Sequence, residues 1–291
     1  MSTVTSLGTI SIELSSPLVE VQIGKATQAQ TMSLEHVSSK TIDDITMKLQ
    51  CKFDCFYTTG CSISSTGEIV LIEYGYQRLM ILKVDGTLKR RIPLSTPLPV
   101  DCACVDNKIV AVTFAASKQL QIINVLTETI ERKISTNNAC FGLCYSDGYL
   151  LYFEYGTGIQ KVNMSGNCSS TLVKDHTLPH WSYVATLKEK IYYTNNSHHT
   201  VTCCSLTGEK MWEYKDQLVQ SPRGVSVDKD SNVYIASAGN DSIIVLSSDG
   251  KQAKKVLGIE DGIRCPFGLA FDLKKGKLIV VNYDAPALYG L

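Results

Sequence analysis

The fold is decided by residues 221–250, which read SPRGVSVDKDSNVYIASAGNDSIIVLSSDG. Three apolar runs, Gly224–Asp228, Val233–Ser237 and Ser242–Leu246, are separated by turns rich in Asp, Asn and Gly, and a fourth run, Lys251–Leu257, follows. Short runs rich in Val, Ile and Tyr between turn residues are typical of β-strands, and no sustained 3.6-residue period indicates a helix. Four strands in about 40 residues are the signature of one β-propeller blade.

Similar strand–turn–strand units recur along the chain. Their turn positions are residues 86, 127, 166, 208 and 250, so the steps are 41, 39, 42 and 42 residues. The second copy has Thr127 where the other four have glycine. A period in this range indicates a repeat architecture in which each unit packs against its neighbours.

The two ends of the repeat array favour a closed ring over a solenoid. The last unit stops after the start of its third strand at Leu291, whereas the alternating segment Ile45–Phe53 is a spare strand before the first unit. An N-terminal strand that completes the last blade closes the ring and leaves no open sheet edge. We therefore expect an all-β, six-bladed β-propeller over residues 41–291, preceded by an N-terminal extension or linker over residues 1–40. The blades are expected to open near Gly60, Cys102, Phe141, Ser182, Arg223 and Phe267.

The charge of the chain is balanced, with 28 Lys and Arg against 28 Asp and Glu in 291 residues. This balance disfavours a DNA binder or a membrane-surface binder, because both need an excess of basic charge. Residues 1–24 do not resemble a secretory signal, so the eleven cysteines predict reduced thiols and a cytoplasmic protein. The cysteine spacing contains no zinc-ligand series, and neither a metal nor another cofactor is expected.

Residues 221–228, 232–237 and 240–243 resemble the NHL repeat closely, and CPFGLAFD at 265–272 opens another copy. The segment from Ile42 to Ile63 resembles the start of the propeller in tripartite-motif (TRIM-NHL) proteins, with the invertebrate, molluscan-type members most similar. The resemblance covers most of residues 40–291. It implies the substrate- or client-docking module of a ubiquitin-ligase family protein whose RING finger, B-boxes and coiled coil are not found in this chain.

In a propeller, the loop before each innermost strand and the loop between its second and third strands meet on one face, around the channel mouth. Loops on a rigid frame commonly carry function, and Trp, Tyr and Arg supply much of the energy at protein interfaces. We therefore expect a protein or peptide partner on this face. The candidate binding residues are Tyr57, Arg78, Phe141, Tyr155, His180, Trp181, His198, Arg223, Asn240, Phe267 and Tyr283.

Several of these residues also have a purely structural interpretation. Trp181 and Phe267 stand at strand starts, where packing between blades is an equal alternative to binding. His198 and its neighbour His199 fit a solvated turn better than a metal site, because no further ligands accompany them.

Two other functions stay open from the sequence. RNA binding on the same face would use Arg78, Lys118, Arg223 and Arg264, a small set because a typical RNA site needs converging cations and stacking aromatics. A calcium-dependent lactonase-like hydrolase would use oxygen ligands at the channel; the candidates Asn138, Asn195, Asn240 and Asp284 lack the Glu and His set that hydrolysis needs. No nucleophile elbow or phosphate-binding loop occurs. We therefore expect no catalytic residues and no enzymatic activity.

Overall fold

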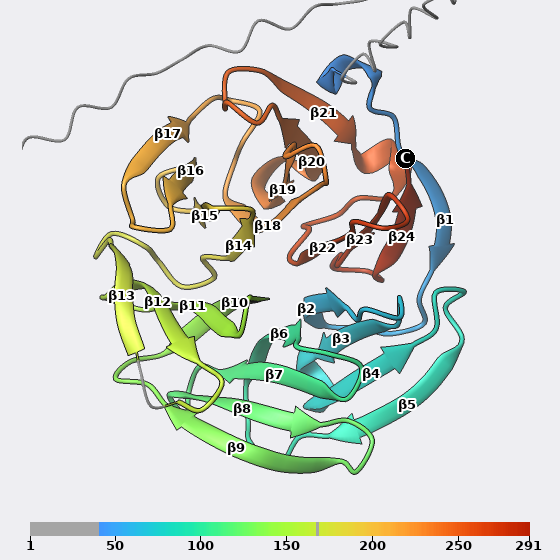
Figure 1. The fold of residues 1–291 in the computed structure, drawn as a ribbon. Helices are drawn as coiled ribbons and strands as arrows, with labels where there is room; N and C mark the ends of the chain where they lie inside the picture. The colour runs from blue at the N-terminus through green and yellow to red at the C-terminus, as the bar shows by residue number, and fades with distance from the viewer. Residues whose placement is uncertain (1–40, 167–168) are drawn as a thin grey trace, which may run out of the picture. The chain divides into compact units, whose positions relative to one another are not determined.

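The computed structural model describes residues 41–166 and 169–291 and confirms an all-β, six-bladed β-propeller. Six antiparallel four-stranded sheets stand in a ring, each with its first strand at the centre (Figure 1). No helix in these described residues is long and apolar enough to cross a membrane. The expected N-terminal extension, residues 1–40, lies outside the described residues.

Each blade runs from an innermost to an outermost strand. The strands of the first three blades are β2 (Thr58–Ile63), β3 (Ile69–Glu73), β4 (Arg78–Leu82) and β5 (Leu88–Pro93); β6 (Pro99–Cys104), β7 (Ile109–Phe114), β8 (Gln119–Asn124) and β9 (Thr129–Ser135); and β10 (Cys140–Ser146), β11 (Tyr149–Glu154), β12 (Gly158–Asn163) and β13 (Ser169–Lys174). The strands of the other three are β14 (Val184–Leu187), β15 (Lys190–Asn195), β16 (Thr200–Ser205) and β17 (Lys210–Tyr214); β18 (Pro222–Val227), β19 (Val233–Ser237), β20 (Ser242–Leu246) and β21 (Ala253–Leu257); and β22 (Leu269–Asp272), β23 (Lys277–Val280), β24 (Ala287–Gly290) and β1 (Lys48–Lys52). Four short 3-10 helices complete the described elements: η1 (Ile42–Asp44), η2 (Tyr74–Tyr76), η3 (Ala238–Asn240) and η4 (Ile259–Asp261).

The turn between β18 and β19 shows why polar residues recur between the strands. The buried carboxylate of Asp228 accepts hydrogen bonds from the backbone N–H groups of Asp230 and Asn232, both at 2.9 Å. It also accepts one from the hydroxyl of Tyr234 at 3.2 Å. A buried carboxylate needs such partners, because an unpaired charge in the interior is costly.

The N-terminal strand closes the ring, as the sequence predicts. Strand β1 pairs antiparallel with β24, with Leu49 opposite Tyr289 and Lys52 opposite Ala287, and becomes the outermost strand of the sixth blade. Without β1, β24 would present an unpaired edge, which is a template for aggregation.

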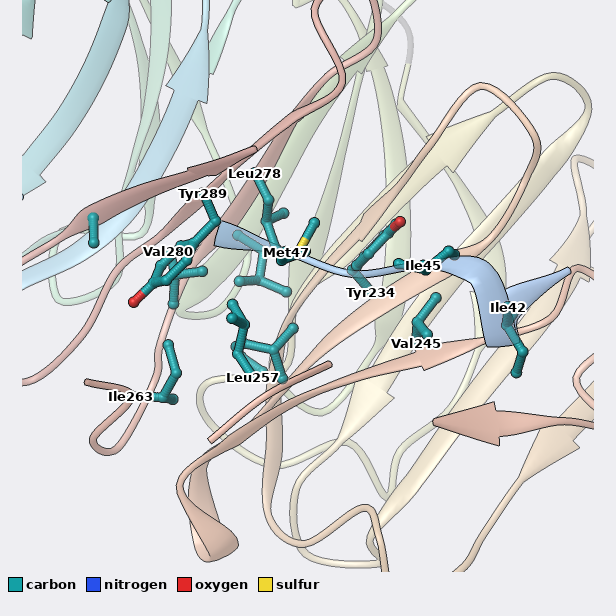
Figure 2. Close-up of a cluster of buried hydrophobic side chains, with 14 residues drawn as sticks. Ile42, Ile45, Met47, Tyr234, Val245, Leu257, Ile263, Leu278, Val280 and Tyr289 are labelled. Atoms are coloured by element: carbon teal, nitrogen blue, oxygen red, sulfur yellow. The ribbon is translucent and has the colours of Figure 1, made fainter. Parts of the chain in front are cut away.

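The segment before β1 also joins two blades. Figure 2 shows Ile42, Ile45 and Met47 along this segment, within a buried cluster that includes Tyr234 of the fifth blade and Tyr289 of the sixth. The ammonium group of Lys254 donates hydrogen bonds to the carbonyl oxygens of Asp43 (2.6 Å) and Ile45 (2.8 Å). The closure therefore depends on buried side chains as well as on strand pairing.

The hydrophobic core lies between blades, and the centre is narrow. One buried cluster, for example, combines Ile72 and Leu79 of the first blade with Val112 and Phe114 of the second. A Cβ atom added to Gly142 would lie 2.4 Å from the Cα of Tyr183, so glycine permits the close approach of two innermost strands.

The side chain of Tyr183 crosses the central channel at the level of Gly142. The hydroxyl of Tyr183, from the fourth blade, donates a hydrogen bond to the carbonyl oxygen of Thr59 in the first blade at 3.0 Å, and both residues are buried. In the second blade, Asp101 occupies the equivalent level, and its carboxylate accepts a bond from the N–H of Leu143 in the third blade (2.9 Å). These two side chains fill the waist of the channel, so its two mouths are separate surfaces.

Candidate binding site at the channel mouth

Two sets of loops build one mouth of the channel. The leading loops precede the innermost strands, and the crossing loops join the second and third strands of each blade. Backbone hydrogen bonds hold the two sets together: the N–H of Tyr74 donates to Tyr57 (2.9 Å), and the N–H of Tyr283 donates to Arg264 (3.0 Å). Side chains from both sets therefore project from a fixed frame.

A polar residue at the end of the second strand fixes the leading loop in several blades. Glu73 accepts a hydrogen bond from the N–H of Phe56 (3.2 Å), and Glu154 accepts one from the N–H of Asn138 (2.7 Å). The hydroxyl of Ser237 does the same for Gln220 (2.8 Å). Because a buried carboxylate binds a backbone N–H strongly, the loops that carry the aromatic residues are well anchored.

Two aromatic residues of the leading loops adopt left-handed backbone conformations. Tyr57 has φ 51° and Trp181 has φ 66°. Such values are uncommon for residues with a bulky side chain and persist only where the surroundings enforce them. They turn both rings toward the channel mouth.

An apolar pocket of about 190 Å³ lies at this mouth. It is lined by residues of the first, fourth and sixth blades: Tyr57, Thr58, Thr59, Tyr74, Trp181, Phe267 and Tyr283. A second, more open hollow of about 420 Å³ shares Tyr57 and Tyr283 with it and adds Phe56, Tyr76 and Asp284. The two hollows form one continuous surface around these shared tyrosines.

Ring contacts extend this surface into the third blade. Trp181 has ring centroids 6.3 Å from Tyr74, 6.0 Å from Phe267 and 5.9 Å from Phe141, all in edge-to-face geometry. His180 continues the contacts, 5.0 Å from Phe141 and 4.4 Å from Tyr155. We call this surface the aromatic rim, and it comprises Phe56, Tyr57, Tyr74, Tyr76, Tyr155, His180, Trp181, Phe267 and Tyr283, with the buried ring of Phe141 beneath them.

The charges on the aromatic rim are unevenly paired. Arg78 forms an ion pair with the buried Glu73, and Arg264 lies 3.9 Å from Asp284. The guanidinium of Arg223 lies 3.8 Å above the ring of Phe267 and makes no hydrogen bond or ion pair with any other side chain in the described part of the chain. Its Nη1 is buried without a hydrogen-bond partner.

Thr58, in the pocket wall, is a second residue with a buried polar atom that has no hydrogen-bond partner. It is only 3% exposed, and its hydroxyl has no hydrogen-bond partner. Buried polar groups are normally paired, so these two atoms at one mouth have hydrogen-bonding capacity that no described side chain uses.

The structure brings most of the sequence-predicted residues together. Tyr57, Trp181, Phe267 and Tyr283 line the pocket. The ring contacts described above add Phe141, Tyr155 and His180, and the cation–ring contacts add Arg223 and also Arg78, which lies 4.7 Å from the ring of Tyr76.

Two predicted residues serve their own loops instead. The ring of His198 lies in a turn, with its Nδ1 3.3 Å from the side-chain amide of Asn195. The amide of Asn240 donates to the carbonyl oxygen of Leu218 (2.8 Å) and accepts a bond from Ser242. Neither residue is part of the aromatic rim.

The sequence argument missed Tyr74, Thr58 and Thr59 as pocket residues. A positional signal exists for Tyr74: like Tyr155 and Tyr283, it directly follows a polar residue at or just after the end of the second strand of its blade. Alignment of the blades on Glu73, Glu154 and Asn282 would have found all three tyrosines. No comparable signal marks Thr58.

The other mouth of the channel has a different chemistry. A hollow of about 230 Å³ there is lined by all six innermost strands and includes Cys61, Cys102, Cys104 and Cys144. Burial raises the pKa of these thiols above the ordinary value, to about 12 for Cys104, so they stay protonated. Among the described residues, no group of three or more His, Cys, Asp or Glu side chains is arranged to hold a metal ion.

Three of the four oxygen-bearing side chains named for a lactonase-like site, those of Asn195, Asn240 and Asp284, are engaged by neighbouring loop residues. Asn138 is tied to Glu154 through its backbone, and Asn195 caps its own turn by accepting bonds from the N–H groups of Ser197 (3.2 Å) and His198 (3.0 Å). Asp284 faces Arg264.

The sequence matches no protein-family model and no curated protein. Solved structures do match. A virginiamycin B lyase from Staphylococcus aureus is 16% identical, with a TM-score of 0.60 over 84% of this chain and 89% of the lyase chain. A chain of a nidogen–laminin complex is 13% identical, with a TM-score of 0.64 over 73% of this chain and 84% of its own. At these identities the similarity shows the six-bladed fold alone.

The expectation of no enzymatic activity, which was drawn from missing catalytic motifs, is wrong. Besides the virginiamycin B lyase, a streptogramin B lyase matches over 84% of this chain, with 12% identity and a TM-score of 0.59. The same propeller thus supports enzymes, and a missing hydrolase motif does not exclude catalysis, because function resides in the site and not in the fold.

Proposed function

We propose that this chain is a partner-recognition propeller that docks a protein or peptide on the aromatic rim. The observation that carries the proposal is the apolar pocket between Tyr57, Trp181 and Phe267, bordered by Arg223. Exposed apolar surface of this kind marks interaction sites, and Trp, Tyr and Arg dominate binding energy at protein interfaces. The nidogen–laminin complex is a case in which a chain of similar fold occurs in a protein assembly.

A finer proposal follows from the resemblance to the NHL repeat. The chain would be the substrate- or client-docking module of a TRIM-like ubiquitin-ligase family protein. A cytoplasmic location belongs to this proposal, and it is supported by the ten cysteines of the described residues, all of which are free thiols.

The charge pattern favours a protein over RNA on this surface. An RNA site needs several converging cations. Of the four cations that RNA binding would use, Arg78 and Arg264 each face a carboxylate, which leaves Arg223 at the aromatic rim and Lys118 on the crossing loop of the second blade.

The proposal is tested with the immobilised chain and a double variant, Trp181→Ala with Arg223→Ala. The matched control is Tyr149→Ala with Lys161→Ala, because this pair is also an aromatic ring with a cation, 3.8 Å apart, and lies outside the aromatic rim. Retained proteins and retained RNA are identified in parallel. We expect a specific protein partner that binds the wild type and the control and is lost from the rim variant.

Folding of the variants is checked by circular dichroism, and Tyr283→Ala provides a second rim variant because Tyr283 is 60% exposed. If every retained partner survives both rim variants, the chosen face is wrong. If RNA rather than protein is lost with Arg223→Ala, the surface is an RNA site.

A further inference from the structure

We propose that the pocket is an anchor site for one aromatic side chain of an acidic peptide segment, with a carboxylate of that segment bound by Arg223. This inference rests on the proposed docking function and adds the chemistry of the partner. It follows from the size of the pocket, its lining and the unpaired polar atoms beside it.

The size of the pocket fits a single ring. Its volume is about 190 Å³, and a cavity of roughly 150 Å³ in another protein holds benzene. The ring of Trp181 already packs edge to face with those of Tyr74 and Phe267. Another ring that enters between them would make the same kind of contact, which aromatic pairs prefer.

The lining disfavours a strongly polar ligand such as a sugar. Apart from the tyrosine hydroxyls and the indole N–H of Trp181, the polar side-chain groups in the pocket wall are the hydroxyls of Thr58 and Thr59. Thr59 already donates its hydroxyl to the carbonyl oxygen of Val100 (2.7 Å). A sugar ring buried here would leave most of its hydroxyls without partners, and that is unfavourable.

The unpaired hydroxyl of Thr58 and the unpaired Nη1 of Arg223 can both donate a hydrogen bond, and an anion is the acceptor that suits a guanidinium best. Two of the four buried side-chain atoms without a hydrogen-bond partner in the described residues are Thr58 Oγ1 and Arg223 Nη1. Thr58 lines the pocket, and Arg223 stacks on Phe267, which lines it too. A guanidinium held in place on a ring binds a carboxylate well, because its donors match the two carboxylate oxygens.

The other charges at the rim limit how many anionic groups of a partner can be bound. Arg78 and Arg264 are already paired with Glu73 and Asp284, so they offer little to further anions. One free cation next to one ring-sized pocket suits an Asp or Glu beside a Phe in a peptide. Exposed Tyr57 and Tyr76 are placed to cover the flanking residues of such a segment.

The test uses the full chain with Trp212→Phe, because the chain has two tryptophans and this change leaves Trp181 as the fluorescent reporter inside the pocket. The probe is an acetylated, amidated pentapeptide with the sequence glycine–aspartate–phenylalanine–aspartate–glycine. Two matched peptides replace phenylalanine by alanine or both aspartates by lysine. We expect saturable fluorescence change with the first peptide and at least about tenfold weaker binding of the other two.

Variants then separate the two parts of the site. Arg223→Gln should weaken the acidic peptide about tenfold and abolish its advantage over the lysine peptide, since a charge-assisted pair is removed. Tyr283→Ala should weaken all ring-bearing peptides. The control Tyr149→Ala with Lys161→Ala should change nothing.

Equal binding of the acidic and lysine peptides, indifference to Arg223→Gln, or no saturable signal would each overturn the inference. The pull-down with the immobilised chain separates the two proposals. If the peptide test fails but the retained partners are still lost from the rim variant, the docking function stands and only the anchor chemistry fails. If those partners are retained as well, both proposals fail together.

Discussion

Asp101 and Tyr183 fill the channel waist, at the level where Gly60, Gly142, Gly224 and Gly268 allow the other innermost strands to approach closely. Burial raises the pKa of the Asp101 carboxyl to about 7, even though the N–H groups of Leu143 and Cys102 donate to it. Burial also raises the pKa of the Tyr183 phenol. These two residues therefore keep a low-dielectric plug between the aromatic rim and the thiol-lined mouth.

This plug predicts a pH-dependent stability. The pKa of Asp101 in the folded chain lies above the unfolded value of about 3.9, so the folded state binds the proton more tightly. Its contribution to stability is fully present below about pH 4 and is lost as the pH rises toward 7, by at most about 1.4 kcal/mol per pH unit. Urea unfolding of wild type and Asp101→Asn should show this loss in the wild type only. A difference between the two proteins that does not change from pH 4 to 7.5 would contradict it.

At the scale of the element, the strands were predictable from the sequence, but the side-chain hydrogen bonds that join strands to loops were not. Alternating apolar runs and Asp-Gly turns repeat every 39–42 residues, so the number of blades and the borrowed strand β1 follow from the sequence pattern. The hydrogen bond that the N–H of Phe56 donates to Glu73 joins a loop to a strand end 17 residues away, and no local pattern encodes it. Trp181 had two equal interpretations because it does both: it packs between blades and lines the pocket.

The closure by the N-terminal segment gives a prediction at this scale. Ile45 and Met47 are buried between the fifth and sixth blades, whereas Leu49 on β1 is 47% exposed. Ile45→Ala and Met47→Ala should each lower the free energy of unfolding by about 2–5 kcal/mol, because each leaves a cavity. Leu49→Ala should change it by less than about 0.5 kcal/mol. Urea titration checks all three, and equal effects would mean that strand pairing alone closes the ring.

Across the whole molecule, the six blades are alike in frame and unlike at the channel mouth. The first, third, fourth and sixth blades supply the aromatic rim, whereas the corresponding crossing-loop positions of the second and fifth blades hold Ala115 and Ala238. The repeat predicts a near-symmetric ring, so composition and period alone could not show which sector carries the pocket. The sector is set by side chains at equivalent positions, and this asymmetry locates the proposed binding surface.

The charge of the whole molecule decides how its binding should respond to salt. Acidic and basic residues balance, and the aromatic rim has one cation without an acidic partner, Arg223. A partner held by apolar contacts and one ion pair should lose no more than about tenfold in affinity between about 50 and 500 mM salt, because each paired phosphate or carboxylate contributes at most about one unit to the log–log slope. An RNA held through several phosphates would lose orders of magnitude over the same range. Titration of the retained partner at four salt concentrations, with Arg223→Gln as the uncharged reference, measures this slope. A slope of log affinity against log salt concentration well above one would contradict this if Arg223→Gln reduced it only in part. Other cations would then contribute to binding, and the partner would be more strongly anionic than a peptide with one bound carboxylate.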